Sequence, residues 1–246
     1  MFYCSSGKYF KWAAHDDLLG PKFLSECLEG FKRLENNAVL VYPNFVFVDE
    51  AGVPLNIDSA FVHTTSASPA SRVRETLAGL QLVTSVFGLF RRDALARTRL
   101  IGSYQSADFA LLLECAMLGQ IVRLEGRPQF QRRLHDKSSQ VNKTDEEIAV
   151  WFDPDVLMNS RPDRRLRREY FRSVFMLDGL SNTQRLSVAT ALFFTIAKSK
   201  LRSKAKRVKR RMVSRLEITS PIQAPPPNAA RQMMPSRFHK VDTDKE

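Results

Sequence analysis

Residues 39–52 read VLVYPNFVFVDEAG, in which two apolar runs flank a Pro-Asn pair. The runs, residues 39–42 and 45–48, are rich in β-branched and aromatic residues, which favour strands. Residues 49–52 carry the acidic and glycine residues typical of a turn that ends a strand. The preceding segment, residues 20–34, has apolar residues at helical spacing and a proline in its first turn. A helix followed by two short strands predicts an α/β fold.

The flanking segments continue the alternation of strands and helices. The further expected elements are a strand over residues 9–14, a loop over 56–70, a helix over 72–80, a strand over 83–90, a short helix over 92–95, a helix over 109–118 that stops at Gly119, strands over 121–124 and 129–133, and a polar loop over 135–139. This order predicts a layered α/β body that ends near residue 140.

The C-terminal part has a different composition. Residues 145–180 are rich in arginine and are expected to be helical, with breaks at prolines. From Lys198 to Arg215 ten of eighteen residues are basic, and apolar residues recur there every three or four positions, which predicts a basic amphipathic helix. The proline-rich and polar end is expected to be disordered. We therefore expect three parts: a body over residues 1–140, a helical extension over 141–217 and a disordered tail over 218–246.

Charge is distributed unevenly along the chain. Residues 1–160 hold 17 Lys and Arg against 19 Asp and Glu, whereas residues 161–246 hold 21 against 7. A polyanionic partner is thus expected only at the C-terminal part. The three cysteines have no C-x-x-C spacing, so a reducing compartment is the simpler interpretation. No signal peptide is recognisable, and the apolar run 186–197 is about half of the roughly 20 residues that span a bilayer.

Asp16 and Asp17 form a carboxylate pair at the end of the first expected strand. Adjacent carboxylates suit a divalent cation bound to a diphosphate, since Mg²⁺ and Mn²⁺ prefer oxygen ligands and share them with substrate phosphates. The alternative is structural, because acidic pairs also occur before helices, where they favour the positive end of the helix dipole.

Several segments in one order resemble the middle of family 2 glycosyltransferases with the GT-A fold. These segments are GKYFKWAAHDD at residues 7–17, VY at 41–42, DEAG at 49–52, FGLFRRDAL at 87–95, AD at 107–108 before an apolar helix, and RRLH at 132–135 with SS at 138–139. The resemblance covers roughly residues 7–140, and ordered motifs are more specific than any single one. It implies a partial GT-A mixed sheet with flanking helices.

The resemblance also implies an activity, namely inverting transfer of a sugar from a nucleotide-diphosphate sugar to a hydroxyl of a glycan or lipid-linked acceptor. Asp17 would bind Mg²⁺ or Mn²⁺, Asp16 would support the cation or touch the ribose or sugar, and His135 would be a further metal or phosphate contact. Asp108 would take the proton from the acceptor hydroxyl. The substrate-binding candidates are Trp12, Gly88, Arg91 and Arg133.

Structural alternatives stand beside these roles. Asp108 can also be the N-cap or first-turn acid of the helix over residues 109–118, a role geometrically compatible with that of a base, and His135 can be a polar loop residue. Gly88 can serve close backbone packing, and Trp12 can belong to the core.

The chain departs from the family pattern at three places. Ala107 stands where many members have Glu, and His15 stands where an acidic or small residue is common. Few residues precede the strand that leads to Asp16, whereas the family usually opens with βα units that hold the donor nucleotide. We expect the donor site of the chain as given to be incomplete.

The basic helix suggests a second function class. An apolar run followed by a basic amphipathic helix has what an interfacial membrane anchor needs, and it suits equally a helix that covers the body with a solvated basic face. The rival to an enzyme is a non-catalytic protein that binds a membrane surface or polyanion through Lys204, Lys206, Arg207 and Arg210. No motif for specific nucleic-acid recognition is present. The expected location is cytoplasmic, with possible peripheral contact to the cytoplasmic membrane face.

Overall fold

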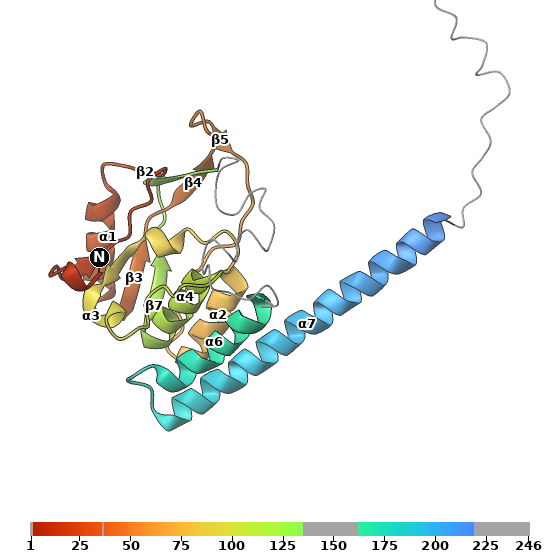
Figure 1. Cartoon of the computed structure of the whole chain (residues 1–246). Coiled ribbons are helices and arrows are strands. Elements are labelled where there is room, and N and C mark those ends of the chain that lie inside the picture. Colours follow the sequence, from red (N-terminus) through yellow and green to blue (C-terminus); the bar gives the residue numbers. More distant parts are fainter. Residues whose placement is uncertain (1, 36, 135–161, 219–246) are drawn as a thin grey trace, which may run out of the picture. The chain divides into compact units, whose positions relative to one another are not determined.

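The computed structural model describes residues 2–35, 37–134 and 162–218, with side chains described up to residue 201. The chain divides into two compact units, Met1–Lys198 and Ser199–Glu246. The first unit is a mixed α/β structure, as the sequence predicts (Figure 1). None of the helices in the described ranges has a stretch long and apolar enough to cross a bilayer.

The first of two four-stranded sheets is built around β3 (Ala38–Tyr42), every residue of which is buried. Its order is β1 (Tyr9–Phe10), β6 (Leu89–Arg91), β3 and β7 (Gln120–Arg123). β3 runs parallel to β7 and antiparallel to β6. A fully buried strand with a parallel neighbour explains why residues 38–42 form a continuous apolar run rather than an alternating one.

The second sheet has the order β2 (Leu18–Leu19), β8 (Phe130–Arg133), β4 (Phe45–Val48) and β5 (Pro54–Leu55). β4 follows β3 directly in the chain, β8 follows β7, and β4 and β8 are again parallel. The same pair of chain segments therefore contributes the central strands of both sheets. A turn at Asp49, which accepts a hydrogen bond from the Gly52 amide at 3.1 Å, ends β4 as predicted.

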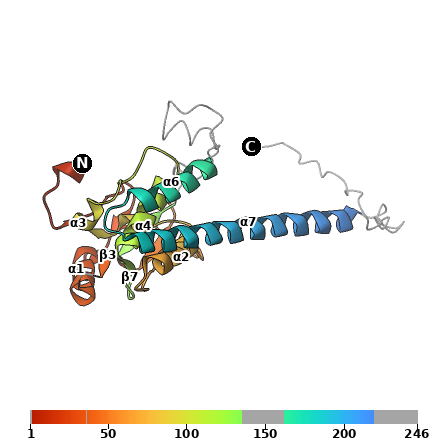
Figure 2. The same cartoon turned by 90° about the horizontal axis from the view of Figure 1, so that it is seen from below.

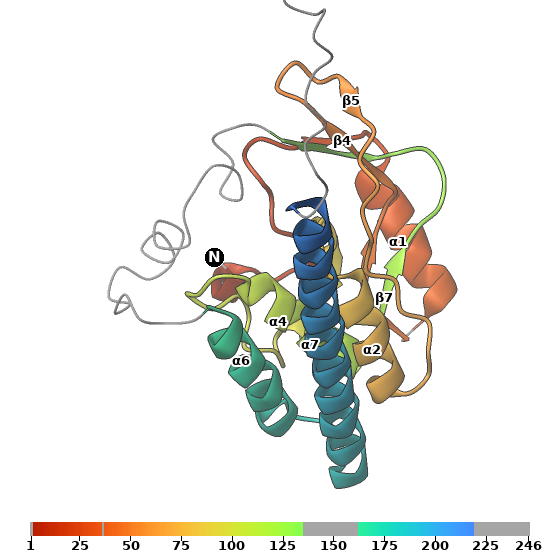
Figure 3. The same ribbon diagram turned by 90° about the vertical axis from the view of Figure 1, so that its right-hand side faces the viewer.

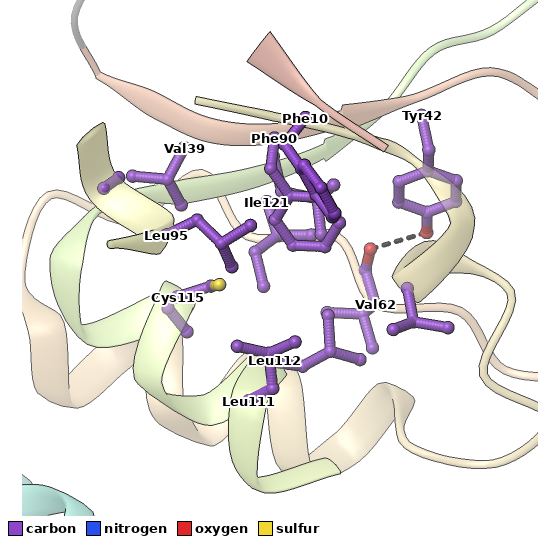
Figure 4. Packing of buried hydrophobic residues seen from close by; sticks show 14 of the residues in the cluster. Phe10, Val39, Tyr42, Val62, Phe90, Leu95, Leu111, Leu112, Cys115 and Ile121 are labelled. Carbon is purple, nitrogen blue, oxygen red and sulfur yellow. Dashed lines mark hydrogen bonds between the residues drawn. The ribbon is translucent and has the colours of Figure 1, made fainter. Parts of the chain in front are cut away.

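Helices cover both faces of the first sheet. α1 (Phe23–Leu34) buries Phe23, Cys27 and Phe31 against one face. α4 (Ala107–Leu118) packs on the other face, with α2 (Pro69–Gly79) beside it and α3 (Arg92–Leu95) directly after β6. Figure 4 shows this core, in which the Tyr42 hydroxyl donates to the Val62 carbonyl at 2.6 Å. A short 3₁₀ turn, η1 (Phe2–Cys4), adds Phe2 to the same core.

Two further helices pack outside α2 and α4. α6 (Pro162–Met176) and the first part of α7 (Asn182–Ile218) lie side by side there (Figures 2 and 3). Their buried residues form a second apolar cluster with α2 and α4, which includes Val174, Val188 and Leu192. The apolar run 186–197 and the basic run 198–215 thus belong to one continuous helix.

Two expected strands are wrong in their extent. Residues 83–90 contain a 3₁₀ turn, η2 (Ser85–Phe87), because the amides of Phe87 and Gly88 donate to the carbonyls of Thr84 and Ser85. Only β6 remains as strand. The strand expected over residues 9–14 is limited to β1, which pairs with β6 only through Tyr9 opposite Arg91 and Phe10 opposite Phe90. His135 and the expected tail over 218–246 lie outside the described residues, apart from Ile218 at the end of α7.

Gly88 lies where no larger residue fits. A Cβ atom there would come within 2.7 Å of Leu40 Cδ1, 2.8 Å of Tyr42 Cβ and 2.9 Å of the Val41 carbonyl oxygen. We expect Gly88→Ala to lower the free energy of unfolding by about 1–3 kcal/mol, because overpacking against backbone forces β3 and η2 apart. Urea denaturation measures this. Gly52→Ala is the comparison variant. A Cβ atom at Gly52 would meet nothing within 4 Å, but the φ of Gly52 is 85°, so this variant measures backbone strain without overpacking.

Candidate functional site

Asp17 is held against β8 at the edge of the second sheet. The antiparallel register of β2 and β8, with Leu18 opposite Gln131, brings Asp17 opposite Arg132. The Arg133 amide donates to Asp17 Oδ1 at 2.9 Å. Burial raises the pKa of Asp17; this hydrogen bond and the charges of Arg132 and Lys11 act in the opposite direction. The carboxylate thus has one defined orientation.

Asp108 lies in the first turn of α4. The N-cap is Ser106, which adopts a left-handed conformation with φ 61° and makes no capping hydrogen bond through its side chain. Asp108 Oδ1 accepts a hydrogen bond from the Phe109 amide at 3.1 Å. Asp108 is therefore a first-turn acid and not an N-cap. This position is compatible with the role of a general base. Burial raises its pKa above the ordinary range of an aspartate.

Arg132 on β8 lies close enough to both acids for their charges to act on its guanidinium. The charges that act on its guanidinium are, in decreasing strength, those of Asp17, Asp108 and Asp16. Its Nη1 atom is buried and has no hydrogen-bond partner among the described residues. Burial of a guanidinium with an unpaired nitrogen is costly, and three carboxylates offset part of that cost. We call Asp16, Asp17, Asp108 and Arg132 the carboxylate–arginine cluster.

Two further titratable side chains surround the cluster. Lys11 lies beside Asp17, and its ammonium donates to the Trp12 carbonyl at 2.8 Å and lies 4.9 Å from the centroid of the Phe23 ring. Tyr170 of α6 is buried near Asp108, and burial together with that negative charge raises the pKa of its hydroxyl. The neighbours of the cluster therefore come from the segment after β1 and from α6.

A divalent cation would be held by Asp16 and Asp17. Within the described ranges no three His, Cys, Asp or Glu side chains gather closely enough to bind a metal ion by themselves. Magnesium is commonly held by only one or two carboxylates together with substrate phosphates and water, so the pair fits that type of site.

The substrate-binding candidates lie in different surroundings. Trp12 is partly buried, with its ring 4.8 Å from that of Phe10 and 5.1 Å from that of Phe90, so it contacts the core. Arg91 donates through Nε to the Ala38 carbonyl at 2.8 Å and through Nη2 to the Glu35 carbonyl, at the link from α1 to β3. Its described partners are thus structural.

Arg133 is the candidate nearest to the cluster. Its amide binds Asp17, its Nη1 donates to the Glu50 carbonyl at 2.7 Å, and its buried Nε has no described partner. The side chains of Lys204, Lys206, Arg207 and Arg210 lie outside the described residues, although their backbone belongs to α7.

Arg132 belongs to the RRLH segment of the resemblance, but the sequence predicts no individual role for it. The one sequence signal for a role was the position of this charged residue inside the short strand expected over residues 129–133. The pattern of a single strand does not reveal which acidic residues lie near Arg132 in the fold. The chain matches no protein-family model and no curated protein.

Proposed function

We propose that this chain is an inverting glycosyltransferase that moves a sugar from a nucleotide-diphosphate sugar to a hydroxyl of a glycan or lipid-linked acceptor. The observation that supports this most is the carboxylate–arginine cluster. In it the charges of acids from two distant segments, the one after β1 and the first turn of α4, act on one half-buried guanidinium. Acids with raised pKa values next to a specific charge partner are typical of functional sites.

Asp108 serves as the general base. The acceptor hydroxyl transfers its proton to the Asp108 carboxylate as its oxygen forms a bond to the anomeric carbon. The bond between that carbon and the diphosphate oxygen breaks on the opposite face, so the configuration inverts and a nucleoside diphosphate leaves. A partly buried carboxylate with a raised pKa is a stronger base than an exposed one.

Arg132 and the acidic pair act on the leaving group. The half-buried guanidinium supplies a positive charge for the diphosphate, and its Nη1 atom, which has no partner among the described residues, can donate a hydrogen bond to a phosphate oxygen. Asp16 and Asp17 would hold Mg²⁺ or Mn²⁺, which when bound neutralises charge on phosphate oxygens. The Arg133 amide keeps Asp17 oriented for this.

Nucleotide binding tests the proposal without knowledge of the sugar. We expect calorimetric titrations of the chain with UDP, GDP and dTDP to show binding that Mn²⁺ strengthens. Asp17→Ala should remove the Mn²⁺ dependence. Arg132→Gln should weaken binding by roughly 10- to 100-fold with or without Mn²⁺, because a hydrogen bond to a charged group contributes about 1.5–3 kcal/mol.

Asp58→Ala is the matched control, since Asp58 is exposed and is not part of the cluster. It should bind as the wild type does. A wild-type chain that binds none of the three nucleotides in the presence of Mn²⁺ would refute the proposal.

A further inference from the structure

The beginning of α7 has two different apolar faces. On the inner face Val188, Ala191 and Leu192 are buried in the cluster with α2, α4 and α6. On the outer face Leu186, Phe193 and Phe194 are 71%, 61% and 66% exposed. Because Phe193 and Phe194 follow Leu186 by about two helical turns, the three side chains share one side of the helix. One side of α7 thus completes the core of the first unit, and three large apolar side chains on the other side remain exposed.

Two more large apolar residues are exposed where α6 ends. Phe175 and Met176 are 67% and 56% exposed. Arg185, which directly precedes Leu186, donates to the Phe175 carbonyl at 2.9 Å and to the Leu177 carbonyl at 2.8 Å. These bonds tie the last turn of α6 to the first turn of α7. Clustered exposure of this kind marks an interaction site more often than a solvated surface.

Most of the exposed charge on α6 and the start of α7 is positive. Arg164, Arg168 and Arg172 are exposed at four-residue steps along α6, with Arg172 3.9 Å from Glu169, and Lys198 is exposed near the end of the first unit. In the sequence of the second unit, residues 199–215 contain nine Lys or Arg and no acidic residue. Basic residues next to exposed phenylalanine and leucine match a surface that offers both negative charge and hydrocarbon.

A bilayer meets both requirements, whereas a nucleic acid and a second copy of the chain each meet only one. A nucleic acid in water would attract the basic residues but would give the Phe193 and Phe194 rings nothing to bury them. A second copy of the chain would cover the rings but would bring together two C-terminal parts in which 21 basic residues oppose 7 acidic ones. We infer that the outer face of α7, defined by Leu186, Phe193 and Phe194, docks the protein on the surface of an anionic membrane.

Vesicle binding tests this inference independently of any transfer activity. The full chain is sedimented with phosphatidylcholine vesicles, with and without phosphatidylglycerol. We expect binding only when phosphatidylglycerol is present. The double variant Phe193→Gln, Phe194→Gln should bind at least about tenfold more weakly, since each exposed ring loses its burial in the interface. Neutralising Lys204, Lys206, Arg207 and Arg210 to Gln should also abolish the preference for anionic vesicles.

The control is Leu24→Gln, Leu28→Gln, which removes two apolar residues of α1 that are 51% and 38% exposed. It should leave vesicle binding unchanged, and circular dichroism should show that both double variants are folded. The inference is overturned if the wild type does not bind anionic vesicles, or if both double variants bind equally well. A concentration-dependent dimer that the phenylalanine variant abolishes, without vesicle binding, would assign the face to self-association instead.

Discussion

Replacing Asp108 by asparagine is expected to reduce sugar transfer by about 10²–10⁴-fold, the usual contribution of a general base. Asparagine keeps the size of the side chain and an oxygen that can accept from the Phe109 amide, so α4 should retain its first turn. It cannot take a proton from the acceptor hydroxyl. Nucleotide affinity should persist, because the proposed diphosphate contacts are Arg132 and the Asp16–Asp17 pair. Release of nucleoside diphosphate from a panel of nucleotide sugars measures the loss.

The pH dependence of kcat/KM gives a second readout of Asp108. A base works in its ionised form, so activity is lost as pH falls through its pKa. Because burial raises the pKa of Asp108 above the ordinary value of 3.8, the acid limb of the profile should lie above that of an exposed aspartate.

Asp93→Asn is the control for this variant. Asp93 lies in the first turn of α3 and accepts a hydrogen bond from the next amide, that of Ala94, at 2.8 Å, as Asp108 does from Phe109. It is exposed, and no described interaction joins it to the cluster. Equal activity in Asp108→Asn and Asp93→Asn would contradict the assignment of the base.

Replacing Glu114 by alanine is expected to lower the free energy of unfolding by about 1–3 kcal/mol, because the amide and the Nε atom of Arg99 lose their acceptors. Glu114 lies on α4 and is 2% exposed. Its Oε1 lies 2.7 Å from Arg99 Nε, and its Oε2 accepts from the Arg99 amide at 2.8 Å. Arg99 also binds Glu169 of α6, with Nη1 to Oε2 at 2.6 Å. The network joins α4 to α6 through one guanidinium.

Chemical denaturation monitored by circular dichroism measures this effect. The matched control is Glu29→Ala, which removes an exposed ion pair with Lys32 at 3.8 Å and should change stability by less than about 1 kcal/mol. If Glu114→Ala and Glu29→Ala have the same small effect, the buried network does not stabilise the contact between α4 and α6.

The sequence alone predicted the elements whose signals are local. The apolar run over residues 109–118 predicts α4 to within two residues of its start and its stop at Gly119, and the buried strand β3 follows from a continuous apolar run. The turn after β4 follows from its acidic and glycine residues. Each of these depends on residues within one or two turns of each other, because helical and strand periodicities and turn conformations are properties of short segments.

Only the tertiary structure determined which of these segments meet. Asp17 and the Arg133 amide are 116 positions apart in the chain, and the contact exists because β2 pairs with β8. The split of the apolar run 186–197 into a buried and an exposed face depends on where α2, α4 and α6 lie. From the sequence pattern of α7 alone, either apolar face could pack in a protein core or lie on a membrane. Long-range contacts decide burial, and burial in turn determines the pKa values and the charge balance of the candidate site.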